Sequence, residues 1–222
     1  MHRRTYLRSV AATGAVVSAA GCLGSFGDSN PNVALGEPDR EVSSSDLPYP
    51  AWGQKIPNVT IPAPLENRTV SLREVETPSV LTFFYTHCKT ICPVLISTLR
   101  NVQTHASQNG YENDVTFLPV TFDPKRDDAE QLQAYAEKMN VDLSVGDWDF
   151  LRPESKSRAK SVITDEFGVH FEPTKQQSKD KYMFTHSALI ILVNGEGYVE
   201  RAYRGKSPKQ QQIIDDLETV RK

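Results

Sequence analysis

The chain has 222 residues, of which 38% are hydrophobic and 24% are charged, and its formal net charge is -3 at pH 7. This composition supplies enough apolar surface for one well-packed domain with extensions, and it excludes a chain that is disordered throughout. The charge and the lack of a clustered lysine and arginine stripe exclude nucleic acid as a partner, because phosphate binding needs a concentrated positive surface.

The first 21 residues have the pattern of an export signal. Arg3 and Arg4 precede a run of small and apolar residues over positions 10–20, an arrangement that resembles a twin-arginine signal. Such a run extends only about 16 Å as a helix, against roughly 30 Å for the bilayer core, so it is a processing segment and not a membrane span. It ends in "AAGC", which is similar to a lipoprotein processing box and predicts removal of residues 1–21 and a lipid on Cys22. The alternative is that Cys22 is trimmed away.

These features predict a protein that is exported by the twin-arginine route and held by lipid at the extracytoplasmic face of the cell membrane. Residues 22–57 are rich in Ser, Pro, Asn, Gly and acidic residues without periodicity. This composition predicts a flexible tether. The remaining residues, 58–222, are predicted to form one folded domain.

Alternating short runs and helical patterns predict the fold of that domain. Residues 58–71 alternate as a small hairpin does, and buried strands are predicted at 80–85, 115–122 and 188–193, the last joined through "NGEG" to a strand at 198–203. Apolar residues at helical spacing predict helices over 93–104, 129–139, 156–167 and 208–221. At the second helix, Asp127 is predicted to cap the first turn, with Glu130 completing a capping box.

This order of elements predicts a thioredoxin-like α/β sandwich: a central mixed sheet flanked by helices, with an N-terminal hairpin extension. Cys88 and Cys92 then lie where the first strand meets the first helix. Free backbone amides and the helix dipole at this junction favour thiolates, and Lys89 adds a nearby cation. A thiolate is both a nucleophile and a metal ligand, so the placement predicts chemistry without deciding which; inert core cysteines are the alternative.

The spacing of the two cysteines suits a metal ion at least as well as a disulfide. Residues four apart on a helix have Cβ atoms about 5–6 Å apart, whereas a disulfide needs roughly 3.5–4.5 Å. Two metal–sulfur bonds of about 2.3 Å bridge the wider gap. Disulfide formation stays open, because Cys88 is predicted to lie in the loop before the helix. Two thiolates with few other donors select soft ions such as Cu(I), while Cu(II) also needs a nitrogen.

Among the five histidines, His186 is the candidate for that nitrogen. His87 follows a strand end and is predicted to point away from its neighbour Cys88, while His105 and His170 fall in polar surroundings. His186 stands just before the strand at 188–193, which faces the cysteine loop in a thioredoxin-like fold. A histidine at a strand start is more often only a surface residue, so this alternative stays open at this point.

Three stretches together, "FFYTHCKTICP", "FDPKRDDAEQLQAYAEKM" and "YMFTHSALIILVNGEG", resemble the Sco/SenC family of membrane-anchored copper proteins from about Ile56 to the C-terminus. The resemblance implies a thioredoxin-like fold and copper ligands at Cys88, Cys92 and His186. It also implies that the protein assists assembly of the binuclear copper centre on the copper-binding subunit of a cytochrome oxidase. The family's Asp-Pro-x-Arg-Asp stretch falls on Asp123, Arg126 and Asp127, which are expected to surround the site or to form a partner surface.

The sequence thus predicts a copper metallochaperone, and whether it is also an enzyme stays open. The main alternative is a membrane-anchored thiol–disulfide reductase acting on cysteines of the oxidase subunit, with Cys88 and Cys92 as the redox pair. A peroxidase, a structural zinc site and a pure interaction module are weaker alternatives. Zinc normally takes four ligands in a closed site, and this sequence offers three.

Overall fold

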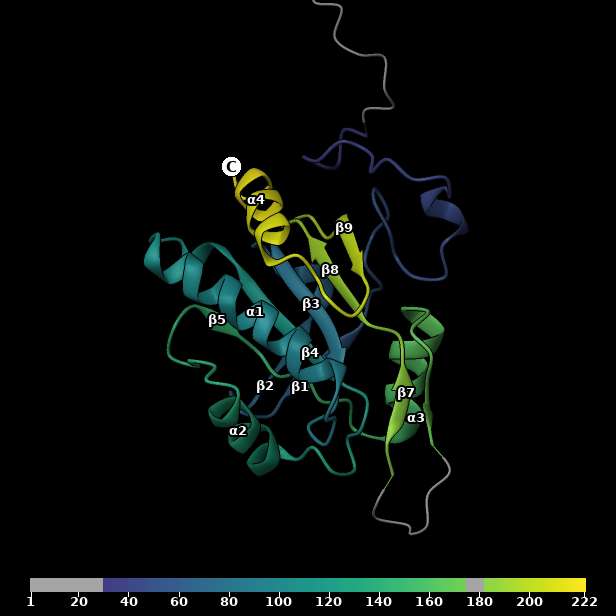
Figure 1. Cartoon of the computed structure of the whole chain (residues 1–222), viewed down its shortest axis with the longest axis vertical. Helices are drawn as coiled ribbons and strands as arrows, with labels where there is room; N and C mark the ends of the chain where they lie inside the picture. The colour runs from purple at the N-terminus through teal and green to yellow at the C-terminus, as the bar shows by residue number, and fades with distance from the viewer. Residues whose placement is uncertain (1–29, 175–181) are drawn as a thin grey trace, which may run out of the picture.

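The computed structural model describes residues 30–174 and 182–222, and the side chain of His186 is outside that description. A five-stranded sheet with strand order β5-β4-β3-β8-β9 forms its centre (Figure 1). β3 is parallel to β4, and β4 to β5, whereas β8 is antiparallel to both β3 and β9. The strands are β3 (Ser79–Phe84), β4 (Thr116–Thr121), β5 (Asp147–Trp148), β8 (Leu189–Val193) and β9 (Val199–Arg204).

In the described part of the chain, four α-helices accompany this sheet. α1 packs against α4 and contacts β3 and β4, so both helices lie on one side of the sheet in Figure 1. α3 continues directly into η4, a π-helical turn, so the helix predicted over 156–167 changes its hydrogen-bond pattern midway. The helices are α1 (Ile91–Gln108), α2 (Ala129–Lys138), α3 (Lys156–Lys160), η4 (Ser161–Glu166) and α4 (Gln210–Val220), with short 3-10 turns η1 (Ser44–Asp46), η2 (Leu72–Glu74) and η3 (Glu112–Asp114).

Two small antiparallel sheets complete the fold. β1 (Thr60–Ala63) pairs with β2 (Arg68–Ser71), which confirms the predicted N-terminal hairpin. β6 (Phe171–Pro173) pairs with β7 (Phe184–His186), and this hairpin is hydrogen-bonded to no strand of the central sheet among the described residues. The mixed sheet with its flanking helices confirms the predicted thioredoxin-like α/β sandwich. No helix within residues 30–174 and 182–222 combines the length and the apolar character that crossing a membrane requires.

The central strands are mostly apolar on both faces. Every residue of β3, β4 and β8 is buried, as expected for strands covered on both faces, and the polar residues among them are serine and threonine: Ser79, Thr82, Thr116 and Thr121. Stacked and edge-to-face rings, such as Phe84 on Tyr135 with centroids 5.5 Å apart, fill the space between β3 and the surrounding helices. The chain leaves β3 at the end where α1 begins.

The described part of the predicted tether is attached to the domain, and this corrects the boundary expected at residue 58. The buried carboxylate of Glu200 accepts hydrogen bonds from the backbone amides of Ala34 and Leu35, each at 2.9 Å. Trp52 donates from Nε1 to the carbonyl of Leu35 at 2.7 Å, and Tyr49 is buried as well. Burial of aromatic rings and pairing of backbone amides therefore outweigh the tether-like composition from Ala34 onward. Residues 1–29, including Arg3, Arg4 and Cys22, lie outside the described residues.

The start of α2 also differs from the prediction. Asp128, and not Asp127, is the N-cap, and its side chain accepts a hydrogen bond of 2.9 Å from the amide of Gln131. Asp127 is fully buried and points into the protein. The predicted cap lies one residue too early, because either of two consecutive aspartates can cap a helix. Only tertiary contacts select between them.

Replacing Glu200 with glutamine is expected to lower the free energy of unfolding by about 1–3 kcal/mol, because its carboxylate accepts three hydrogen bonds in a buried place. The third donor is Asn194 Nδ2, at 2.8 Å. In the variant, the NH2 group of the glutamine would face one of these three donors, and no hydrogen bond could form between them. Urea unfolding measures the change in stability. Hydrogen exchange at the Leu35 amide should also become faster. The exposed Glu196→Gln on the same hairpin is the control, and equal stability of the two variants would contradict the prediction.

Candidate metal centre

Cys88 and Cys92 lie together at the junction between β3 and α1. Cys88 is in the connecting loop, where its amide donates to the Tyr85 carbonyl at 3.2 Å, and Cys92 is in the first turn of α1. The amide of Cys92 donates to the Cys88 sulfur at 3.4 Å, and the hydroxyl of Thr90 lies 3.6 Å from the same sulfur. Both residues are buried thiols. The start of α1 thus directs an amide at Cys88, as the sequence predicts.

The protonation of Cys92 differs from the sequence-based expectation of two thiolates. Burial, followed by its hydrogen bond with Cys88, raises the pKa of the Cys92 thiol far above the ordinary range. Desolvation disfavours a charged sulfur more strongly than the helix amides favour it. Cys92 therefore holds its proton at neutral pH in the metal-free protein, and an ion that binds its sulfur must displace that proton.

The metal-free protein is expected to lose stability in alkaline solution because of Cys92. Its folded pKa lies above the unfolded value of about 8.5, so the unfolded chain releases this proton first. Stability should fall as pH rises past about 8.5, by up to about 1.4 kcal/mol per pH unit. Urea unfolding under reductant at about pH 7 and about pH 9.5 measures this, with Cys92→Ser as the variant that lacks much of the decline. A wild-type protein equally stable at both pH values would contradict it.

The strand that contains His186 lies close to the cysteine junction. A hollow of about 460 Å³ is lined by residues from the start of α1, from β7 and from the segment after β9: Thr90, Ile91, Val94, Phe184, Thr185 and Lys206. The amide of Phe184 also donates to the hydroxyl of Tyr85 at 3.2 Å, which ties β7 to the chain just before the cysteines. The structure thus brings the backbone of the two segments to one hollow.

The other described histidines have different surroundings. His87 is exposed, and its Nδ1 lies 3.0 Å from the Thr86 hydroxyl and 3.9 Å from Oδ1 of buried Asp127. His105 pairs with the hydroxyl of Tyr111 at 2.6 Å, and His170 is exposed. Across residues 30–174 and 182–222, no three histidine, cysteine or acidic side chains gather as a metal-binding cluster; the side chain of His186 is outside this comparison.

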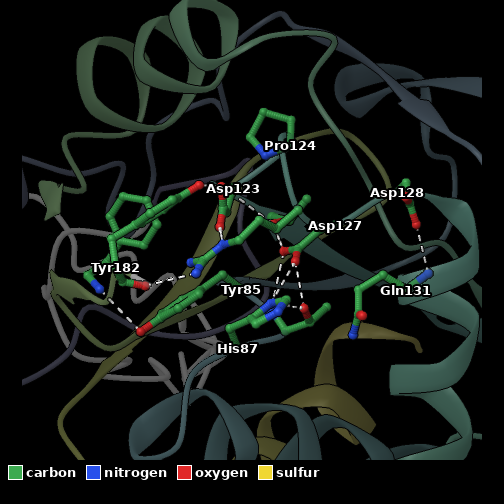
Figure 2. A network of polar contacts seen from close by, with 12 residues as sticks. Tyr85, His87, Asp123, Pro124, Asp127, Asp128, Gln131 and Tyr182 are labelled. Atoms are coloured by element: carbon green, nitrogen blue, oxygen red, sulfur yellow. Dashed lines mark hydrogen bonds and ion pairs between the residues drawn. The ribbon is translucent and has the colours of Figure 1, made fainter. Parts of the chain in front are cut away.

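In the loop that follows β4, residues 123–127, Asp123, Pro124 and Asp127 are buried while Lys125 is exposed, and Figure 2 shows Asp127 beside His87. Asp127 accepts hydrogen bonds from the amide and hydroxyl of Thr86, at 3.2 and 2.6 Å, and a further one from the hydroxyl of Thr121. Burial raises the pKa of the Asp127 carboxyl, while these hydrogen bonds oppose the shift. Asp127 therefore fixes the chain two residues before Cys88.

The other half of this loop holds the chain before β7. Asp123 accepts a hydrogen bond of 2.6 Å from the hydroxyl of Tyr182 and pairs with Arg126 Nε. Arg126 also donates from Nη1 to the Tyr182 carbonyl at 2.9 Å. Because Asp123 and Asp127 are buried, their carboxylates do not form the partner surface that was one of the two expectations. Tyr182 was missed by sequence reasoning, since nothing in its polar local sequence signals a contact with a loop 59 residues away.

Comparison with known proteins places the chain in a family. A model of the SCO1/SenC family matches residues 67–222, which is more than half of the chain. The SCO1 protein homolog of Bacillus subtilis is 27% identical over 139 residues, which cover 62% of this chain and 68% of that protein. Matches to two rickettsial relatives cover 61% and 62% of their lengths. The chain therefore spans about three fifths to two thirds of these relatives.

Solved structures support the same fold. A SCO1/SenC family lipoprotein from Bacillus anthracis superposes with a TM-score of 0.64 at 21% identity, over 78% of this chain and 96% of that one. Bradyrhizobium japonicum ScoI, solved with copper bound, has a TM-score of 0.61 at 18% identity, over 73% of this chain and 98% of that one. At these identities the structural likeness shows the fold alone. Together with the match over residues 67–222, it leads to one conclusion: the chain belongs to the SCO1/SenC family.

Proposed function

We propose that this protein is a copper metallochaperone that binds its cargo through Cys88, Cys92 and His186. In this role it helps to build the binuclear copper centre on the copper-binding subunit of a cytochrome oxidase. The observation that carries the proposal is the shared hollow, which the start of α1 and the strand containing His186 line together. Membership of the family and the copper-bound ScoI support it, as does the description of the Sco family as cytochrome c oxidase assembly proteins.

The chemistry of the donors fits copper. Two cysteine sulfurs at one junction are soft donors, which Cu(I) prefers over harder ions. The imidazole of His186 would add the nitrogen that Cu(II) requires. Burial raises the pKa of the Cys92 thiol, so a metal ion that binds this sulfur must displace its proton.

Delivery of the cargo depends on the oxidation state of the cysteines. Ligand exchange with a partner needs both sulfurs in reduced form, and a disulfide between them would remove two ligands at once. Metal transfer and thiol redox state are therefore coupled in this protein. Each would respond to a change in the other.

The location of the protein is part of the proposal. The twin-arginine pattern would direct export, and cleavage before Cys22 would leave a lipid at the new N-terminus. The domain would then act at the extracytoplasmic face of the cell membrane, where an oxidase subunit displays its copper site. The SCO1/SenC lipoprotein of Bacillus anthracis supports this location.

A second function is favoured by one observation, the pair of thiols at the first strand–helix junction of a thioredoxin-like fold. A thiol–disulfide reductase would use Cys88 and Cys92 as nucleophile and resolving residue, and it would reduce cysteines of the oxidase subunit. This activity needs no histidine. His186 therefore separates the two functions.

Anaerobic titration of the reduced, purified protein with Cu(I) tests the proposal. One equivalent should bind tightly enough to compete with a chromogenic Cu(I) chelator. Failure to bind stoichiometric copper would remove the metallochaperone function and leave the reductase.

A further inference from the structure

We propose that the 123–127 loop is a two-sided brace that fixes the strand of His186 relative to the cysteine pair, with Asp127 and Arg126 as its positioning residues. The inference rests on the proposed function, since it assigns these residues to the same site. The brace would govern retention of Cu(II), which needs both halves of the site, more than that of Cu(I).

The first side of the brace holds the cysteine loop. Asp127 is fully buried, and both of its oxygens are used by hydroxyl and amide donors from Thr86 and Thr121. Thr86 belongs to the chain leaving β3, and Thr121 is the last residue of β4. The carboxylate thus joins the ends of two neighbouring strands, at a point two residues before Cys88. Moving away from any one donor would leave a buried acceptor unsatisfied. Because that costs free energy, the arrangement resists displacement.

The second side holds the chain that enters β7. The guanidinium of Arg126 lies 3.7 Å from the centre of the Tyr182 ring and donates to the carbonyl of the same residue at 2.9 Å. The Tyr182 hydroxyl donates to Asp123, which in turn pairs with Arg126. Figure 2 shows Asp123 on the side of Tyr182 and Asp127 on the side of His87. Charge-assisted and ring contacts therefore meet on one tyrosine, two residues before Phe184.

The β6–β7 hairpin depends on such contacts because no strand of the described central sheet pairs with it. A two-stranded hairpin alone is marginally stable in water. In Figure 1 β7 runs beside α3, apart from the five-stranded sheet. Its other attachments include ring packing among Tyr85, Phe122, Phe171 and Phe184, with centroids 5.0–5.8 Å apart, the bond from the Phe184 amide to Tyr85, and the contact of the Tyr85 hydroxyl with the Met183 sulfur at 3.6 Å. The directional hydrogen bonds of the brace fix the orientation of the hairpin, which apolar ring contacts alone do not determine.

The two oxidation states of copper would respond differently to loosening of this brace. Cu(I) held by two sulfurs needs only the junction of β3 and α1, which Asp127 supports. Cu(II) also needs the nitrogen on β7, whose position depends on Arg126 and Tyr182. Weakening the second side alone should therefore release Cu(II) and spare Cu(I).

Arg126→Gln is the test, and Arg68→Gln is its matched control. Arg68 also pairs with a buried carboxylate, donating from Nη2 to Asp149 at 2.5 Å, but it lies on β2, and among the described residues it makes no hydrogen bond or ion pair with β6 or β7. In the metal-free protein, Arg126→Gln should speed hydrogen exchange at the amides of β7 while the control does not. In the loaded protein it should speed Cu(II) release to a chelator by about tenfold or more, with Cu(I) affinity unchanged within about threefold.

A second variant keeps the test sharp if Arg126→Gln does not fold. Tyr182→Phe retains the ring under Arg126 and removes only the hydroxyl bond to Asp123, so it should shift both readouts in the same direction by a smaller factor. Wild-type exchange at β7 with unchanged Cu(II) release would overturn the brace, and so would equal weakening of Cu(I) and Cu(II). If the wild type binds no copper, the proposed function fails, and hydrogen exchange alone decides the brace: faster exchange at β7 supports it, and unchanged exchange overturns it.

Discussion

A protein with both Cys88→Ser and Cys92→Ser is expected to bind Cu(I) at least about a hundredfold more weakly than the wild type, because a hydroxyl replaces each soft sulfur. Both side chains are buried and serine is slightly smaller than cysteine, so the fold should persist. Competition with a chromogenic Cu(I) chelator measures the affinity. Near-ultraviolet circular dichroism verifies that the core is intact.

The same variant tests whether the cysteines matter in cells. Cells that carry only this protein should assemble less of the binuclear copper centre, and their oxidase activity should fall with it. Unchanged oxidase activity would show that the cysteines are incidental and that the protein acts as an interaction module. If the double variant keeps its Cu(I) affinity, residues other than Cys88 and Cys92 bind the ion.

Replacing His186 with alanine is expected to weaken Cu(II) binding by about tenfold or more and to leave Cu(I) binding nearly unchanged, because a nitrogen donor matters most to the harder ion. His170→Ala is the matched control, since His170 is an exposed histidine beside Phe171, the residue paired with His186 in the hairpin. Titration with Cu(II) followed by absorption separates the two variants. Equal weakening by both would remove His186 from the ligand set.

His186→Ala also separates the two proposed functions. A thiol–disulfide reductase needs Cys88 and Cys92 alone, so its activity on a disulfide substrate should survive the change. A metallochaperone that carries Cu(II) should lose its effect on oxidase assembly. Normal assembly in cells with His186→Ala would therefore favour the reductase over Cu(II) delivery, and the Cu(I) titration then separates a Cu(I) carrier from the reductase.

The central strands could be predicted closely because consecutive residues in each of them are mostly apolar. The run expected at 80–85 became β3, Ser79–Phe84, and the run expected at 188–193 became β8, Leu189–Val193. A strand covered on both faces needs no alternation, so a continuous apolar run suffices to locate it. The position of Cys88 and Cys92 at the first strand–helix junction followed from the same pattern.

Features that depend on distant contacts could not be predicted. Glu200 binds the amides of Ala34 and Leu35 across more than 160 residues, and no local pattern announces this pairing. Asp127 has the sequence signature of a helix cap, yet tertiary donors draw it inward and leave capping to Asp128. Burial raises the pKa of the Cys92 thiol, an effect that the local pattern at a helix start does not reveal. Local chemistry located the site, and long-range packing determined its electrostatics.

Absorption and paramagnetic resonance spectra of the Cu(II)-loaded protein report directly on whether two sulfurs and the His186 nitrogen bind the ion. We predict a sulfur-to-copper charge-transfer band that requires Cys88 and Cys92, together with nitrogen hyperfine coupling that disappears in His186→Ala. A spectrum without sulfur donors, or nitrogen coupling that persists in His186→Ala, would contradict this prediction.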